Sequence, residues 1–228
     1  MSLSRVTDSG RACDAAHVTL DDLTRKKERR HRDREALDAL LDEQLVGTLS
    51  AVTTDGQPWA VPMLFARDGD RLLLHGSTGA GALRHVADDA PAVFSVFSVD
   101  ALVLATSMFD HSANYRSATV RGRLQRLEGD AAWTALDLVS DGLIPGRRDE
   151  VVPMSTKDVA ATVALAMDIT EDNWILKART GGADEDPEHP GMWTGVVPVE
   201  TSYGDPQPSS GAEDLPTPPS VRRLVDGP

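Results

Sequence analysis

A glycine-rich segment is the first candidate for binding chemistry. The run GSTGAG occupies residues 76–81, after an expected strand and before an expected short helix. In that position backbone N–H groups and the helix dipole can hold a phosphate group. The spacing is neither the dinucleotide fingerprint nor a P-loop, because hairpins join the surrounding strands and no Lys-Ser/Thr pair follows. The segment therefore fits anion binding or an ordinary strand-to-helix turn.

A second polar segment, SMFDHSANYRSATVRGR at residues 107–123, leads directly into a long expected strand. Four consecutive residues carry an amide, an aromatic ring, a guanidinium and a hydroxyl: Asn114, Tyr115, Arg116 and Ser117. Such groups at the mouth of a barrel suit contact with a ligand. Strand alternation predicts Tyr115 and Ser117 on one side and Arg116 on the other. Arg121 and Arg123 are interpreted more simply as the exposed face of the strand.

The histidines and the single cysteine form no recognisable metal or catalytic pattern. The spacing of His75, His85 and His111 matches no specific metal motif, and Cys13 lies alone in a polar segment. No G-x-S-x-G elbow is present, so a serine hydrolase is disfavoured. We therefore assign no metal ligand and no catalytic residue from these groups.

Composition excludes several classes of partner. The 228 residues carry a formal net charge of −13, which disfavours binding to nucleic acid. The basic run TRKKERRHRDR at residues 24–34 is a local exception, interpreted as a solvated helix entry or a grip on an anionic partner. No apolar run approaches the roughly 18 residues that span a bilayer, and no signal peptide is apparent. We expect a cytoplasmic protein without membrane contact.

The elements that must position these groups alternate between two periodicities. Residues 35–44, 130–143 and 155–162 have helical spacing, and a brief helix is expected at 82–86. Strands are predicted at 45–52, 59–66, 71–75, 92–99, 101–105 and 115–127, followed by further strand-like pieces at 163–169 and 192–199. Short hairpin turns make the sheet antiparallel. The prediction is an α+β fold with a six-stranded antiparallel barrel and peripheral helices.

Composition also divides the chain into three parts. Residues 1–34 form a polar, basic N-terminal arm, and residues 200–228 form a Pro-rich, acidic C-terminal tail. Residues 35–199 between them are expected to form the barrel domain.

At these segments the chain resembles the pyridoxamine 5′-phosphate oxidase-related flavoproteins, specifically the flavin-nucleotide-binding, nitroimidazole-resistance-like branch. The resemblance runs from about residue 34 to residue 199. Its motifs, in chain order, are DREALDALLDE (33–43), DGQPWAVPM (55–63), DGDRLLLHGSTG (68–79), ALVLATSMFDHSANYRS (101–117), the VRGR step, LIPGR (143–147), KART (177–180) and WTGVVP (193–198). It implies a split β-barrel that forms a homodimer with two FMN sites, each lined by both subunits.

Carried over by position, the resemblance also implies the site residues. The strand through Val61 and Pro62 would lie along the isoalloxazine ring. The ribityl chain and phosphate would be approached by His75, Gly76 and Ser77. The partner subunit would contribute Asn114, Tyr115, Arg116 and Ser117. Lys177 falls near the rim of the site.

One departure from the family pattern concerns the phosphate. Family members usually carry a Ser-Arg or Arg-Lys pair at the start of the short helix, where this chain has Ala80 and Gly81. We expect Arg84, Arg116 or an arginine of the basic arm to substitute, because the phosphate needs local positive charge. The hypothesis is FMN binding that is weakened but not abolished.

The resemblance implies an FMN-dependent oxidoreductase acting on a small-molecule substrate. A flavin needs few catalytic side chains, because the ring carries the chemistry and the protein supplies position and electrostatics. True pyridoxamine phosphate oxidation is disfavoured, since the sequence lacks a second phosphate-binding set. The alternative is a non-catalytic split-barrel dimer that binds haem, a deazaflavin or no cofactor.

Overall fold

The structure, a computed structural model, describes residues 20, 29–79, 83 and 89–227. Its strands are β1 (Arg30–His31), β2 (Val46–Val52), β3 (Pro58–Asp68), β4 (Arg71–Ser77), β5 (Pro91–Leu104), β6 (Ser112–Arg123), β7 (Gln125–Leu127), β8 (Thr162–Asp168), β9 (Trp174–Arg179) and β10 (Gly195–Pro198). Its helices are α1 (Arg34–Glu43), α3 (Gly129–Leu143), the 3-10 helix η2 (Arg147–Glu150), α4 (Thr156–Ala160) and α5 (Pro219–Asp226).

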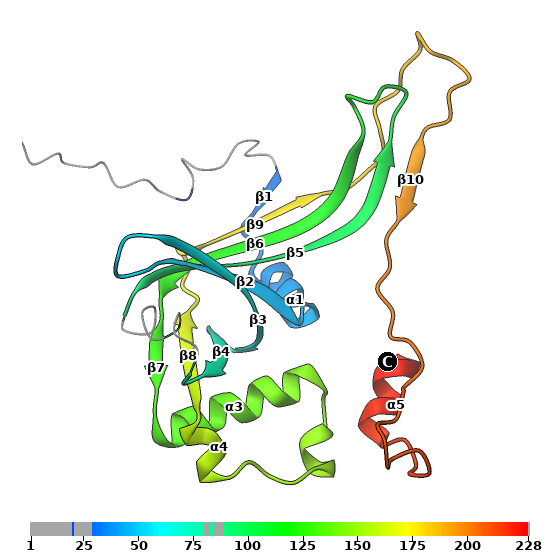
Figure 1. The fold of residues 1–228 in the computed structure, drawn as a ribbon. Coiled ribbons are helices and arrows are strands. Elements are labelled where there is room, and N and C mark those ends of the chain that lie inside the picture. Colours follow the sequence, from blue (N-terminus) through cyan, green and yellow to red (C-terminus); the bar gives the residue numbers. More distant parts are fainter. Residues whose placement is uncertain (1–19, 21–28, 80–82, 84–88, 228) are drawn as a thin grey trace, which may run out of the picture.

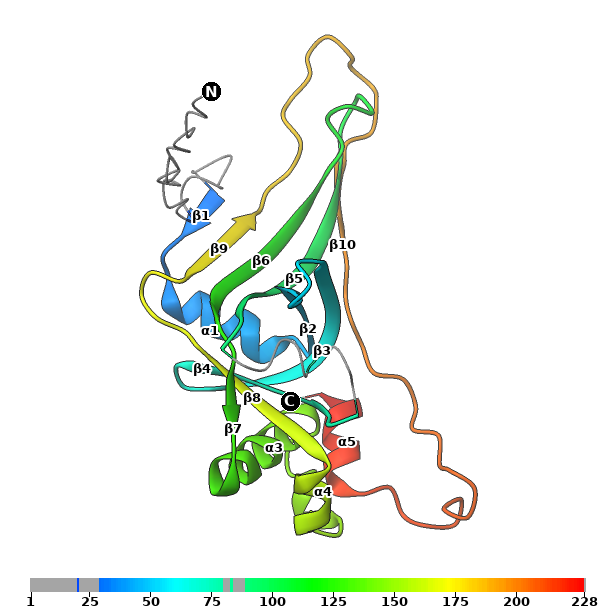
Figure 2. The same ribbon diagram turned by 60° about the vertical axis from the view of Figure 1, so that its left-hand side comes forward.

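All described strands belong to one antiparallel sheet that curls around α1 (Figures 1 and 2). The strand order is β1-β9-β6-β5-β2-β3-β4-β8-β7, and β10 pairs with β5. This arrangement confirms the predicted α+β class, but the predicted strand count of six is wrong, because the sheet has 10 strands. The predicted strands 92–99 and 101–105 are one strand, β5, while β1 and β9 had no strand prediction at all.

Helix α1 fills the inside of the curled sheet. Its N-cap is Asp33, whose carboxylate accepts a hydrogen bond from the Ala36 backbone N–H at 3.2 Å. Leu37, Leu40 and Leu41 lie on one face of the helix and are buried against the strands. The surrounding core includes a T-shaped contact between Phe65 and Phe94, with ring centroids 4.9 Å apart.

Helix α3 covers part of the other side of the sheet. Ala132, Ala135, Leu136 and Val139 are buried in a second core with residues of β4 and β8. The helix lies across these strands below the barrel in Figure 1. The prediction of helices over 35–44, 130–143 and 155–162 is confirmed by α1, α3 and α4. The expected helix at 82–86 lies outside the described residues, except for Leu83, which is buried.

The hairpin of β5 and β6 bends away from the barrel at a β-bulge. Asp100 is the extra residue of this bulge, because Val99 pairs with Tyr115 and Ala101 with Asn114. Beyond it lies what we call the arm, residues 101–114 and 180–198, which projects from the barrel with β10 alongside β5 (Figure 1). The bulge is therefore the point at which the sheet divides into barrel and arm.

The C-terminal segment leaves the arm and returns to the body. Residues 199–218 contain no helix or strand, and α5 then docks near η2 (Figure 1). The Glu150 carboxylate accepts hydrogen bonds from the backbone N–H of Ser220 at 2.9 Å and from its hydroxyl at 2.5 Å. The Pro-rich composition did not predict this helix. Among the described residues, no helix has both the length and the apolar character needed to cross a bilayer.

Candidate functional site

The central sheet has two faces with different surroundings. The inner face packs on α1. The opposite side, which we call the outer face, meets α3 at β3, β4 and β8. By strand alternation the outer face carries six of the residues that the resemblance implies: Pro62, His75, Ser77, Tyr115, Ser117 and Lys177. Val61, Gly76, Asn114 and Arg116 take the alternate positions. Arg84, Ala80 and Gly81 lie outside the described residues.

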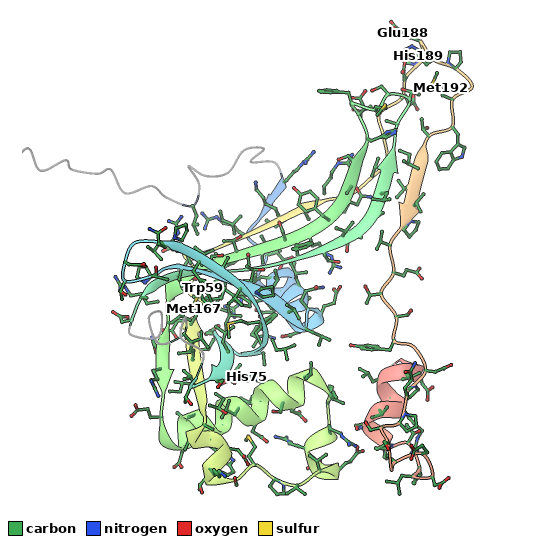
Figure 3. The ribbon with its side chains drawn as sticks, in the orientation of Figure 1. Trp59, His75, Met167, Glu188, His189 and Met192 are labelled. Carbon is green, nitrogen blue, oxygen red and sulfur yellow. The ribbon has the colours of Figure 1, made fainter. Side chains whose placement is uncertain are left out.

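His75 lies on β4 at the border of α3 (Figure 3). Its side chain is half-buried, and its Nδ1 atom is buried without a hydrogen-bond partner among the described residues. Burial lowers the pKa of this imidazole below its ordinary value, because the charged form loses solvation. The ring is therefore neutral near pH 7, the form in which histidine binds a metal ion. A buried ring nitrogen without a partner is the principal polar anomaly of the site.

The glycine-rich loop is fixed by its own hydrogen bonds. Ser77 Oγ accepts from the Gly79 N–H at 3.1 Å, and both the N–H and the hydroxyl of Thr78 donate to the carbonyl of Ala161 at 3.1 Å. Gly76 permits a close approach, because a Cβ there would lie 2.1 Å from Leu83 Cδ1 and the leucine side chain would have to shift. These contacts connect the end of β4, beside His75, to the residue that precedes β8.

Arg116 is engaged in an ion-pair network on the inner side of β6. Its guanidinium contacts Asp100 at 2.7 Å and Glu43, at the end of α1, at 2.6 Å. The hydrogen bonds that Arg116 donates to these two carboxylates raise the arginine's pKa, and the bond from Arg116 is the main cause of the lowered pKa of Asp100. The charge of Arg116 is thus compensated within the chain, which makes it a weak replacement for the family's phosphate cation.

Asn114 and Val61 also have structural surroundings. The Asn114 amide oxygen accepts from Arg179 Nη1 at 2.6 Å, and its NH₂ donates to the carbonyl of Gly181 at 3.0 Å. Val61 is partly buried and packs against the core around α1. The expected contact of Asn114, Val61 and Arg116 with a flavin stays a prediction.

Ser117 and Lys177 come together on the outer face, directly opposite each other in the β6–β9 ladder. They line a cleft of 270 Å³ between β5, β6 and β9. The other lining residues are Leu20, Val93, Thr119, Arg121 and Ile175. Sequence reasoning assigned no ligand role to Thr119 or Arg121. The alternation Ser117, Thr119, Arg121 along one strand was the signal that could have identified them.

The chemistry of the site is binding and positioning. The outer face offers hydroxyls, the neutral imidazole of His75 and, in the cleft, the cations of Arg121 and Lys177. Among the described residues, no group of three or more His, Cys, Asp or Glu side chains could hold a metal ion by itself. Such a surface can hold a planar prosthetic group and its phosphates, while the reactive atoms belong to that group.

Comparison with known proteins identifies relatives for this arrangement. The sequence model of the family described as Pyridoxamine 5'-phosphate oxidase matches residues 33–174. The FAD and haem binding protein from Mycobacterium smegmatis is 44% identical, with a TM-score of 0.83 over 86% of this chain and 97% of that chain. The flavocytochrome Anf3 from Azotobacter vinelandii is 27% identical, with a TM-score of 0.77 over 92% of this chain and 96% of that one.

A more distant structure shares the fold. A putative 5-nitroimidazole antibiotic resistance protein from Bacteroides thetaiotaomicron is 19% identical, with a TM-score of 0.56 over 68% of this chain and 90% of that one. A search of curated proteins found no match. The family match ends within β9, whereas the similarity to the two flavin- and haem-related structures extends over more of the chain.

Proposed function

The chain belongs to the pyridoxamine 5′-phosphate oxidase family, and from this premise we propose that it is a flavin-dependent oxidoreductase of a small molecule that also binds haem. The resemblance in sequence implies FMN as the flavin. The relative with 44% identity is described as binding FAD and haem, and a flavocytochrome matches 92% of the chain. We therefore expect the protein to bind FAD together with haem, and FMN is the alternative flavin.

The observation that carries the haem part of this proposal is His75. Its imidazole is kept neutral by burial, and its buried Nδ1 has no hydrogen-bond partner among the described residues. A neutral histidine is a common axial ligand of haem iron. The side chain also stands at an edge of the outer face, between open sheet and α3 (Figure 3). Because Nδ1 is buried, Nε2 would be the atom that binds the iron, and the half-buried side chain leaves part of the ring accessible for that contact.

The outer face also fits a flavin. A bound flavin supplies hydride or single-electron transfer, so the chain need only bind the flavin, orient it and stabilise its charge. Pro62, Thr48, Ser95 and Thr119 form one cross-strand row on this face, with hydroxyls beside an exposed proline. The two cations of the cleft lie at the far end of the same face. This distribution suits a ligand that is planar at one end and anionic at the other.

We propose that the site is completed by a second copy. Pro62 and Ser117 lie three strands apart, about 14 Å, too far for one ring system to touch both in the same chain. The arm presents exposed apolar side chains that a monomer rarely leaves in water. They are Leu102, Met108, Phe109, Met192, Trp193 and Val197. A homodimer would cover them and would let one copy approach the outer face of the other.

The test begins with the absorbance spectrum of the full-length protein, purified after expression with riboflavin and a haem precursor. The proposal expects flavin and haem absorbance, and extraction of the flavin distinguishes FAD from FMN. His75→Ala is expected to remove the haem absorbance; its flavin content is measured separately, because the resemblance also puts His75 near the ribityl chain. His31→Ala, an exposed histidine on β1, retains both. Absence of flavin absorbance after loading, with no uptake on titration, would overturn the proposed function.

Turnover is tested separately. Reduction of the bound flavin by NADH or NADPH under anaerobic conditions, followed by transfer to an acceptor dye, is expected of an oxidoreductase. A loaded protein whose flavin is reduced by neither donor would instead support the non-catalytic binding alternative.

A further inference from the structure

Among the residues that the structure describes, those that line the cleft between β5, β6 and β9 include no carboxylate, although the chain as a whole carries a net charge of −13. Its charged lining residues are Arg121 and Lys177, and its neutral polar ones are Ser117 and Thr119. Acidic side chains outnumber basic ones by 36 to 23 in the sequence. A pocket that concentrates cations and hydroxyls against this background is suited to an anion.

The strand register fixes how these four groups are arranged. Ser117, Thr119 and Arg121 follow one another on the outer face of β6, so the first and last lie about 13 Å apart along the strand. Lys177 stands directly opposite Ser117 on β9. Lys177 and Ser117 therefore lie at one end of the cleft and Arg121 at the other, with Thr119 between them. Long basic side chains on such a spacing can approach the same phosphate or diphosphate from both sides.

The size of the cleft limits what it can hold. Its volume of 270 Å³ lies just under the roughly 300 Å³ at which pockets for whole small-molecule ligands begin. Ile175, Val93 and Leu20 supply apolar walls. The cleft thus fits a phosphate-bearing part of a ligand whose remainder lies on the open outer face.

We propose that this cleft binds the phosphate or diphosphate group of a nucleotide ligand, with Arg121 and Lys177 as its cations and Ser117 and Thr119 as hydrogen-bond donors. The proposal rests on the proposed function, because we expect the nucleotide to be the flavin. It assigns to Arg121 the role of the cation that is missing at Ala80 and Gly81. Arg121 and Lys177 each have another interaction in the free chain, which the phosphate would join or replace.

The test compares three flavins that differ only beyond the ribityl chain. Riboflavin, FMN and FAD are titrated into the full-length apoprotein, and dissociation constants are measured from flavin fluorescence. Arg121→Gln and Lys177→Gln are expected to weaken FMN or FAD binding roughly ten- to a hundredfold each, and to leave riboflavin binding unchanged. Arg126→Gln is the matched control, an exposed arginine on β7 that does not line the cleft.

ADP and inorganic pyrophosphate are titrated by calorimetry to separate this inference from the proposed function. If the wild type binds no flavin but binds ADP or pyrophosphate, and the two variants lose that binding, the cleft assignment stands and the flavin proposal fails. If the variants bind FMN, FAD, ADP and pyrophosphate like the wild type, the cleft assignment is wrong. It is also wrong if riboflavin affinity falls as much as FMN affinity, or if no phosphate compound binds at all.

Discussion

The guanidinium of Arg116 forms a two-point ion pair with the carboxylate of Asp100, in which Nη2 donates to Oδ1 at 2.7 Å and Nε donates to Oδ2 at 3.1 Å. Asp100 is the bulged residue of β5, and its backbone carbonyl accepts a hydrogen bond from Val199 at 3.0 Å. Arg116 also reaches Glu43 at the end of α1. One residue pair therefore joins the helix inside the barrel, the bend of the arm and the segment that follows β10.

Asp100→Asn tests the strength of this junction. The substitution keeps the size of the side chain and removes its charge, so the Arg116 contact is no longer an ion pair, although the guanidinium can still donate to the amide oxygen. Because both side chains are about one-third exposed, we expect a loss of about 1 kcal/mol or less in the free energy of unfolding, measured in urea. Asp89→Asn, which removes a more exposed partner of Arg123, is the control and should change stability by much less. If the two substitutions lower the free energy of unfolding equally, the Asp100–Arg116 contact contributes no more to stability than the exposed Asp89–Arg123 pair.

Acid should weaken the same junction. The hydrogen bond from Arg116 holds the pKa of Asp100 below its ordinary value. Such a carboxylate stabilises the fold at every pH above its unfolded-state pKa of about 3.9, and that stabilisation disappears as pH falls through the folded-state pKa. We expect the urea midpoint to drop below pH 4, and to drop less in Asp100→Asn. Identical pH profiles for wild type and variant would contradict this assignment.

Gly47→Ala should disturb the core of the barrel. A Cβ at this position of β2 would lie 2.2 Å from the ring of Phe94 and 2.9 Å from Val96, both buried. We expect a loss of about 1–3 kcal/mol in unfolding free energy from overpacking. At Gly182 an added Cβ meets nothing within 4 Å, so Gly182→Ala is the control and should stay within about 0.5 kcal/mol. A stable Gly47→Ala variant would mean that Phe94 can move aside.

Glu150→Gln should loosen the C-terminal helix. The carboxylate accepts from both the backbone N–H and the hydroxyl of Ser220, and these bonds, the hydroxyl first, lower its pKa. Trypsin cuts after arginine, so release of α5 should speed cleavage at Arg222 and Arg223, followed by mass spectrometry. Glu213→Gln, in the same tail but away from this contact, should digest at the wild-type rate. An unchanged rate in Glu150→Gln would mean that other contacts hold α5.

Charge on the arm should separate the proposed dimer. Phe109 is 94% exposed at the tip of the arm, where Figure 3 also places Met192. Phe109→Asp is expected to shift the mass measured by light scattering from dimer toward monomer, because burying the new carboxylate is costly. Val152→Asp, equally exposed at 90% but outside the arm, should stay dimeric. A wild-type monomer, or a dimer in both variants, would exclude the arm as the contact.

Local sequence patterns predicted the elements that are amphipathic on their own. The spacing of the leucines correctly predicted helix α1, because it marks the buried face of the helix. The glycines at 56 and 69 correctly predicted two hairpin turns, because both have the positive φ that such turns need. Strand β9 was missed because its partners are distant in the sequence. Helix α5 was missed because its N-terminus is stabilised by Glu150, far away along the chain.

At the site too, local patterns were predictable from the sequence and long-range contacts were not. Alternation along β6 correctly predicted that Tyr115 and Ser117 face away from Arg116. That Arg116 is held by Glu43 and Asp100 could not be predicted, because neither carboxylate is close to it in sequence. The resemblance supplied His75, but only the folded chain shows that its Nδ1 lacks a partner among the described residues.

The pairing of β1 with β9 constrains the order in which the molecule assembles. Arg30 lies opposite Lys177, so β1, near the N-terminal end of the chain, can pair only after β9 has been synthesised. Closing so long a loop costs entropy before any contact repays it, which slows folding. During synthesis the edge of β6 that β9 will occupy stays open, and open edges invite pairing with other chains. Slow expression at low temperature should therefore favour the native product.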